Sequence, residues 1–178
     1  MAFEEKTLDD KLVYHGLVFD VHRYTVTAVN GGTAERDIVD HNGGSVMLAI
    51  TDQGKVLTVR QYRKSMEREM LELPAGKLDK GEDPLEAAAR ELREETGYTA
   101  SDIRHLITVN VSCGYDRELL HIYLCRGLTP GETDFDETED LDLYEYDPDE
   151  LFQMVMRGEI YDAKTVIGIL FARCAGEI

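Results

Sequence analysis

The chain has 178 residues, 43% of them hydrophobic, which is enough for one well-buried domain with a small additional region. Its net charge of −17 disfavours non-specific binding to nucleic acid, which requires clustered Lys and Arg. No segment approaches the roughly 18 consecutive apolar residues of a membrane span. We therefore expect a protein that binds neither nucleic acid nor membrane.

The first forty or so residues favour a small β region. Residues 11–27 alternate loosely between apolar and polar types, which fits two strands or one bent strand. The run Asn30-Gly31-Gly32 is a turn signal, so a strand over residues 33–40 would close a hairpin. Asn42-Gly43-Gly44 then interrupts the chain before the next apolar run.

Short strands dominate the middle of the chain. An apolar run predicts a buried strand over residues 46–50, and a turn at Asp52-Gln53-Gly54 leads into a second strand over residues 55–61. Three more segments fit strands: residues 70–73, 103–111 and 119–124. Strands mixed with a few helices indicate α/β or α+β layers.

One helix is framed by local rules. Asp83 is a good N-cap, Pro84 suits the first helical position, and Gly97 suits the left-handed residue that ends a helix. These signals predict a helix over residues 84–96. Its expected apolar stripe is rich in small residues and consists of Leu85, Ala88, Ala89, Leu92 and Thr96.

Three glutamates crowd the last turns of this predicted helix, namely Glu91, Glu94 and Glu95. The C-terminal end of a helix carries partial negative charge, and like charges three or four residues apart repel. A solvated charged face is one interpretation, and a site for a divalent cation is the other. The crowding at this end favours the cation and therefore metal-assisted chemistry on a phosphate.

The spacing around these glutamates carries a resemblance. Five residues separate Gly76 from Glu82, and seven more precede the run Arg90-Glu91-Leu92-Arg93-Glu94-Glu95-Thr96-Gly97, which apolar Tyr98 follows. All nine specified positions of this 23-residue pattern match those of the Nudix hydrolases, so the chain resembles that superfamily. Upstream, residues 59–63 (Val-Arg-Gln-Tyr-Arg) and 71–76 (Leu-Glu-Leu-Pro-Ala-Gly) are similar to its ADP-ribose pyrophosphatase branch.

The resemblance implies the Nudix fold, an αβα sandwich with a mixed sheet. It also implies that residues 1–42 form an antiparallel sheet for homodimerisation and that residues 43–178 form the hydrolase domain. The implied reaction is hydrolysis of a nucleoside diphosphate linked to another moiety, with ADP-ribose giving AMP and ribose 5-phosphate. The alternatives are a nucleotide-sugar pyrophosphatase acting on UDP-glucose or GDP-mannose and a non-enzyme that senses ADP-ribose.

Hard oxygen ligands suit Mg²⁺ or Mn²⁺. Glu91 and Glu95 are four residues apart and can hold one ion together, while Glu94 can hold a second ion or bridge the two. By resemblance alone, the carbonyl oxygen of Ala75 is a further ligand. Glu94 is therefore both a candidate metal ligand and a candidate catalytic residue.

Eleven acids and no basic residue lie between Glu132 and Glu150. By itself this composition is typical of a solvated loop that leads to an edge strand. In the Nudix family the corresponding loop supplies a catalytic carboxylate, so Glu139 or Glu137 is the expected base. Glu139 is favoured because the strand-like segment 141–143 follows it at the expected distance.

Candidate substrate-binding residues come from the same resemblance. Arg60 and Arg63 are expected phosphate clamps, because arginine matches phosphate in a bidentate way. The alternative for either one is a structural ion pair with a nearby acid, Glu67 or Glu69. Glu72 is expected either to hydrogen-bond Arg90 or to lie near the metals, and Gly114 is expected in the substrate site. The nucleobase is expected to stack on Tyr14, Phe19 or Tyr24.

One position departs from the ADP-ribose pyrophosphatase branch, which usually has a proline before a glycine here. In this chain Cys113 precedes Gly114. The three cysteines show no metal-ligand spacing and are expected to be free thiols, with Cys125 and Cys174 in the core. The first six residues lack the basic start and apolar run of a signal peptide, so the cytoplasm is the expected location.

Two further helices are expected near the C-terminus. A capping sequence that begins at Asp147 predicts one of them, and apolar spacing predicts another over residues 162–175. The second helix is expected to bury Val166, Ile169, Leu170 and either Cys174 or Ala172.

Overall fold

The computed structural model describes residues 4–134 and 141–178, and the chain forms two compact units. The first unit combines Met1–Gly43 with Asn110–Leu119, and the second combines Gly44–Val109 with Leu120–Ile178. Residues 110–119, which are distant from residues 1–43 in the sequence, belong to the same unit. Within the described residues, no helix is both long and apolar enough to cross a membrane.

The first unit is an antiparallel sheet in the order β1-β2-β3 (Thr7–His15, Asp20–Thr27 and Thr33–Asp40). The early alternating segment therefore forms two strands rather than one bent strand. The loop after β8 adds to the edge of β3, because the Val39 N–H donates to the Tyr115 carbonyl at 2.7 Å and the Arg117 N–H donates to the Val39 carbonyl at 3.1 Å.

The second unit contains two sheets. The first has the order β7-β4-β9-β8, with β7 at Ala75–Lys77, β4 at Gly44–Ala49, β9 at Leu119–Pro130 and β8 at Tyr98–Asn110. Strand β4 pairs in parallel with β9 and antiparallel with β7, so the sheet is mixed. The second sheet is antiparallel, in the order β10-β5-β6 (Leu141–Tyr146, Val56–Arg63 and Arg68–Glu72).

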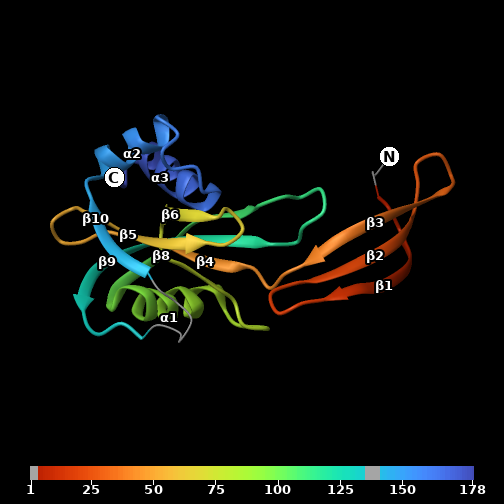
Figure 1. Cartoon of the computed structure of the whole chain (residues 1–178), viewed down its shortest axis with the longest axis horizontal. Coiled ribbons are helices and arrows are strands. Elements are labelled where there is room, and N and C mark those ends of the chain that lie inside the picture. The colour runs from red at the N-terminus through yellow and green to blue at the C-terminus, as the bar shows by residue number, and fades with distance from the viewer. Residues whose placement is uncertain (1–3, 135–140) are drawn as a thin grey trace. The chain divides into compact units, whose positions relative to one another are not determined.

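Helices cover both faces of these sheets. Figure 1 shows α1 (Pro84–Thr96) on one side and α2 (Pro148–Met156) with α3 (Ala163–Ala175) on the other. Successive residues of β4 point to opposite faces, so Met47 belongs to the core cluster with Leu92 of α1, and Leu48 belongs to the cluster with Ile169 of α3. The predicted mixed α/β sandwich is confirmed.

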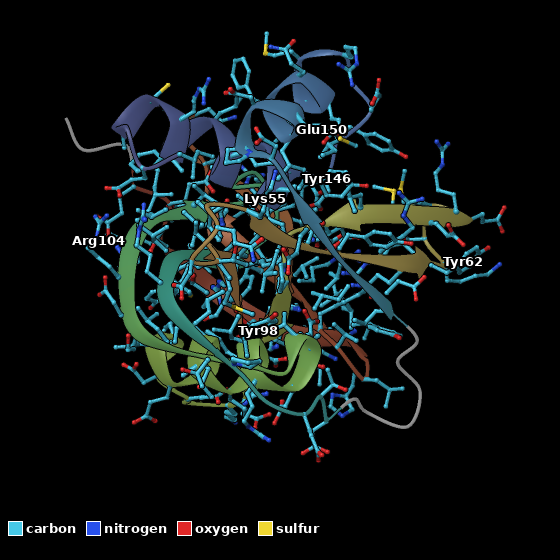
Figure 2. All side chains as sticks on the ribbon, turned by 90° about the vertical axis from the view of Figure 1, so that its left-hand side faces the viewer. Lys55, Tyr62, Tyr98, Arg104, Tyr146 and Glu150 are labelled. Atoms are coloured by element: carbon cyan, nitrogen blue, oxygen red, sulfur yellow. The ribbon has the colours of Figure 1, made fainter. Side chains whose placement is uncertain are left out.

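An ion pair at the surface joins α2 to the turn between β4 and β5. The Lys55 ammonium lies 3.3 Å from Asp147, the N-cap of α2. Figure 2 shows Lys55 and Tyr146 below α2, with Glu150 in the helix itself. This contact anchors the start of the helix that the Asp147 capping sequence predicted.

The structure corrects two details of the predicted core. Leu85 and Ala89 are exposed, and α1 instead buries Ala87 and Glu95 together with Ala88, Leu92 and Thr96. The buried face is rotated because the carboxylate of Glu95 packs inward against β7. Cys125 is buried as expected, but Cys174 is exposed, because α3 turns Ile169 and Ala172 toward the sheet.

Candidate active site

Helix α1 has the caps that its sequence predicted. The Asp83 side chain accepts hydrogen bonds from the backbone N–H groups of Leu85 and Glu86 at 2.9 and 3.4 Å. Gly97 adopts a left-handed conformation with φ of 73°, and its N–H donates to the Arg93 carbonyl. Both helix ends are therefore defined locally, which sets where the acidic residues of the last turns emerge.

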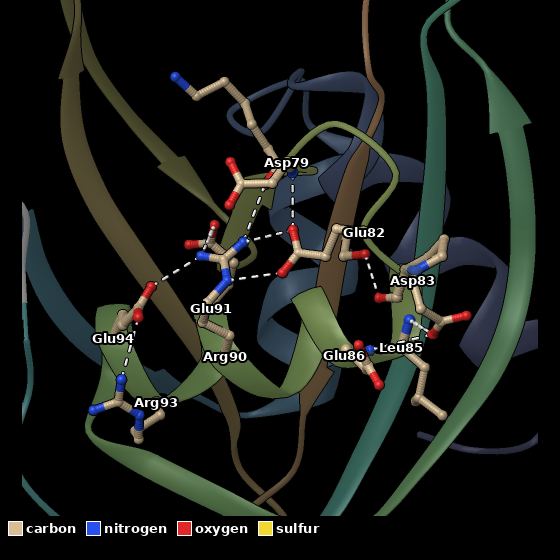
Figure 3. Close-up of polar contacts among 12 residues, drawn as sticks. Asp79, Glu82, Asp83, Leu85, Glu86, Arg90, Glu91, Arg93 and Glu94 are labelled. Carbon is tan, nitrogen blue, oxygen red and sulfur yellow. Dashed lines mark hydrogen bonds and ion pairs between the residues drawn. The ribbon is translucent and has the colours of Figure 1, made fainter.

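Arg90 lies at the centre of the acidic cluster. Figure 3 shows its guanidinium between Glu82 on one side and Glu94 on the other. Nε and Nη2 each lie 3.0 Å from the Glu82 carboxylate, while Nη1 donates to Glu91 at 2.7 Å and to Glu94 at 3.0 Å. The hydrogen bonds that Arg90 donates to Glu82, and then those to Glu91 and Glu94, hold the pKa of Arg90 above its ordinary value despite partial burial.

Strand β7, which the sequence did not predict, brings the turn before Gly76 against α1. Glu95 is only 4% exposed, and its Oε2 accepts a hydrogen bond from the Ala75 N–H at 3.0 Å. The carboxylate of Glu91 lies directly against Gly76, because a Cβ at that position would fall 1.7 Å from the Glu91 Cδ. The fixed spacing of Gly76 from the acidic run was the sequence signal for this contact.

The acidic cluster has the chemistry of a cation site. Among residues 4–134 and 141–178, no three His, Cys, Asp or Glu side chains form a ready-made metal cage. Mg²⁺, however, is usually bound by one or two carboxylates together with waters and substrate phosphates. Glu91 and Glu94 both accept from the same Nη1 atom of Arg90. One oxygen of each carboxylate therefore points at the same positive charge, that of the Arg90 guanidinium.

The buried carboxylate of Glu72 forms an ion pair with Arg63. The Nε and Nη2 atoms of Arg63 each donate to Glu72 at 2.8 Å, and Lys164 also donates to Glu72, which is 2% exposed. Burial by itself raises the pKa of Glu72, but the hydrogen bonds and charges of Arg63 and Lys164 outweigh burial and lower it.

This ion pair corrects two expectations about its members. Glu72 does not bond Arg90, whose guanidinium is taken by the acidic cluster, and Arg63 does not pair with Glu67 or Glu69. The register of β5 and β6 explains the difference. It pairs Val59 with Glu72, and the two-residue period of a strand puts Arg63 on the same face as Val59.

Arg60 lies on the opposite face of β5 from Arg63, because the two positions are three residues apart in a regular strand. Its guanidinium stands over the Tyr144 ring, 5.2 Å from the centroid. The Nε of Arg60 is buried and has no hydrogen-bond partner within the described part of the chain. The structure therefore does not bring the two expected phosphate clamps together.

The two candidate bases, Glu137 and Glu139, lie outside the described residues. The residues on either side of that segment are both held on the second unit. The Asp134 N–H donates to the Glu94 carbonyl at 3.0 Å, at the C-terminal end of α1, and Leu141 pairs with Gln61 of β5.

Gly114 and the candidate nucleobase-stacking residues belong to the first unit. Gly114 follows the exposed Cys113 in the loop that joins β3, and a Cβ added at Gly114 would point into open space. Tyr14 packs against Phe19 with their ring centroids 5.9 Å apart, and Tyr24 lies under the Arg117 guanidinium. The role of each in substrate binding remains a prediction.

Comparison with a solved structure shows the fold. The structure of an ADP compounds hydrolase matches with a TM-score of 0.84 at 20% identity, covering 98% of this chain and 97% of that one. The two proteins therefore share a fold over nearly their whole lengths. The NUDIX domain family matches residues 41–166, and the chain belongs to this family.

Curated relatives match over nearly the whole chain. The methanol dehydrogenase activator of Bacillus methanolicus is 42% identical over 95% of this chain and 92% of its own length. The ADP-ribose pyrophosphatase of Bacillus subtilis (strain 168) is 39% identical over 96% of this chain and 93% of its own length. The GDP-mannose pyrophosphatase of Escherichia coli (strain K12) is 28% identical over 92% of this chain and 90% of its own length.

Proposed function

We propose that this protein is a cytoplasmic, Mg²⁺- or Mn²⁺-dependent hydrolase that converts ADP-ribose to AMP and ribose 5-phosphate. The observation that carries the proposal is the contact between the acidic end of α1 and β7, where Glu95 bonds the Ala75 N–H at 3.0 Å. This contact gathers candidate metal ligands from two elements at one place. Relatives named ADP-ribose pyrophosphatase, 39% and 35% identical, support the substrate.

Each candidate residue has a role in this proposal. The carboxylates of Glu91, Glu94 and Glu95 would hold the cation, together with the carbonyl of Ala75. When bound, Mg²⁺ or Mn²⁺ neutralises the diphosphate and lowers the pKa of a bound water. The base, Glu139 or Glu137, takes the proton of the attacking water. The water oxygen bonds to one phosphorus as the bond from that phosphorus to the bridging oxygen breaks.

Substrate binding is assigned to Arg63, Arg60, Glu72 and Gly114. Arg63 uses two of its five N–H donors on Glu72, so three remain for phosphate oxygens. Glu72 thereby acts through Arg63 rather than on the substrate. The Nε of Arg60, which is buried and has no partner among residues 4–134 and 141–178, is a further candidate donor.

The first test is turnover of ADP-ribose, UDP-glucose and GDP-mannose, with Mg²⁺, with Mn²⁺ and with a chelator. Metal-dependent cleavage dominated by ADP-ribose supports the proposal. The variants Glu139→Gln and Glu137→Gln then identify the base, because the correct one lowers kcat more than it raises KM. The proposal fails if the purified protein leaves ADP-ribose intact in the presence of either metal.

A nucleotide-sugar pyrophosphatase is the second candidate. Cys113 stands where the ADP-ribose pyrophosphatase branch usually has a proline, and relatives named GDP-mannose pyrophosphatase are 28% identical. A preference for GDP-mannose or UDP-glucose in the same assay supports this candidate. Binding of ADP-ribose without any turnover supports a sensor instead.

We propose that the first sheet forms a homodimer interface and that residues 1–42 serve this purpose. Strand β1 is exposed along its whole length and carries the apolar residues Leu8, Leu12 and Tyr14, each at least half exposed. Gel filtration tests the dimer against the 20.1 kDa mass of one chain. Leu12→Glu is expected to give a monomer, whereas Lys11→Glu, which adds the same side chain beside it, is the matched control.

A further inference from the structure

A pocket of about 450 Å³ opens in the second unit, between the β5–β6 hairpin and the N-terminus of α3. Its volume lies within the range of sites that bind small molecules. The chain connects this pocket to the acidic end of α1, because Glu72 in the pocket wall is three residues before Ala75, which bonds Glu95. It is lined by apolar and charged side chains, including Arg63, Met70, Glu72, Tyr161, Asp162 and Lys164.

A chain of ion pairs forms the charged wall of this pocket. The side chain of Lys164 is 12% exposed and lies between two carboxylates, with Asp162 at 3.0 Å and Glu72 as its other partner. Glu72 in turn holds Arg63 through two hydrogen bonds. Two positive and two negative charges therefore balance, and the wall would carry one net negative charge without Lys164.

The polar groups that remain suit a sugar phosphate. The Arg63 side chain is 40% exposed, and its three remaining donors form an edge that matches a phosphate group. The described hydrogen bonds and ion pair of Asp162 all use Oδ2, which leaves Oδ1 to accept a bond from a sugar hydroxyl. Met70 and Tyr161 give the pocket an apolar side for the carbon face of a sugar ring.

We propose that this pocket binds the sugar-phosphate half of the substrate and that Lys164 is its positioning residue. The phosphate lies on the outer edge of Arg63, and the sugar packs on the apolar side. Lys164 holds Glu72 in place for Arg63 and removes the net negative charge that would repel a phosphate. This inference rests on the proposed function for the identity of the substrate, whereas the binding site itself can be tested without catalysis.

The direct test is calorimetric titration of the full-length protein with ribose 5-phosphate. Lys164→Met removes the charge at similar volume, and Lys164→Arg retains it. Loss of one charge beside a bound phosphate is expected to weaken binding about tenfold in Lys164→Met, while Lys164→Arg stays within about threefold of the native protein. Equal affinities for native and Lys164→Met protein, or no binding to the native protein, would overturn the proposal.

Two controls separate this role from a purely structural one. Titration with AMP should be unchanged in Lys164→Met, since AMP is the other product; an equal loss for AMP overturns the assignment to the sugar-phosphate half. If Lys164→Met does not fold, Lys164→Gln takes its place, because its amide can still donate to Glu72 without carrying a charge.

Kinetics of the same variants distinguish this inference from the proposed function. With ADP-ribose, Lys164→Met should raise KM about tenfold while kcat stays within about threefold. A fall in kcat with KM unchanged contradicts the inference and leaves the proposed function standing. If the native protein hydrolyses no ADP-ribose, the proposed function fails, and the ribose 5-phosphate titration still decides whether the pocket binds a sugar phosphate.

Discussion

Replacement of Gly76 by alanine should separate activity from stability. Gly76 belongs to β7 and pairs with Ser45 of β4, and its φ lies outside the left-handed region, so alanine can adopt the backbone conformation. The added methyl group, however, points at Glu91. It would lie 1.7 Å from the Glu91 Cδ and 2.0 and 2.2 Å from its two carboxylate oxygens.

The size of the effect follows from these distances. Carbon atoms pack at about 3.5–4.0 Å, so the Glu91 carboxylate must move by about 2 Å. A misplacement of about 1 Å at a reacting group can lower the rate about 100-fold. We therefore expect Gly76→Ala to lower kcat/KM at least about 100-fold. The clash involves the end of a flexible side chain, so the free energy of unfolding should fall by only about 1 kcal/mol.

The assay is metal-dependent turnover of ADP-ribose, with thermal unfolding measured on the same samples. Glu91→Gln and the double variant complete a double-mutant cycle. If alanine acts by displacing Glu91, the double variant is about as slow as either single variant. Activity of Gly76→Ala within about fivefold of the native protein, or additive losses in the double variant, would refute the reasoning.

Three other predictions test single side chains. Glu95→Gln keeps the hydrogen bond from Ala75 but removes a charge, so turnover should fall by orders of magnitude with circular dichroism unchanged. Thr165→Val removes the hydroxyl that accepts from the buried Leu73 N–H at 2.8 Å; urea unfolding should show a loss of about 1–3 kcal/mol. Glu72 has a pKa below its ordinary 4.5 in the folded state, so its contribution to stability is present above pH 4.5 and is lost as the pH falls through the lowered value. The unfolding temperature of Glu72→Gln should therefore fall less steeply below pH 4.5 than that of the native protein. A parallel decline would contradict the assignment.

The sequence determined what depends on near neighbours. Helix α1 begins and ends where Asp83 and Gly97 predict, because a cap bonds backbone groups only a few residues away. The pairing of Arg90 with Glu94 is equally local, since residues four apart share a helix face. The spacing from Gly76 to Tyr98 identified the family for the same reason, because it lies within one continuous segment.

The tertiary structure decided which distant residues meet. Strand β7 is only three residues long and carries no periodicity, yet it brings Ala75 to Glu95. Glu72 pairs with Arg63 and Lys164 because strand register and the N-terminus of α3 place these charges together. Lys164 and Glu72 are 92 residues apart, and no local sequence pattern predicts a contact at that separation. Local rules gave the helices and the acidic cluster from the sequence alone, whereas the ion pairs around Glu72 depend on how strands and helices pack.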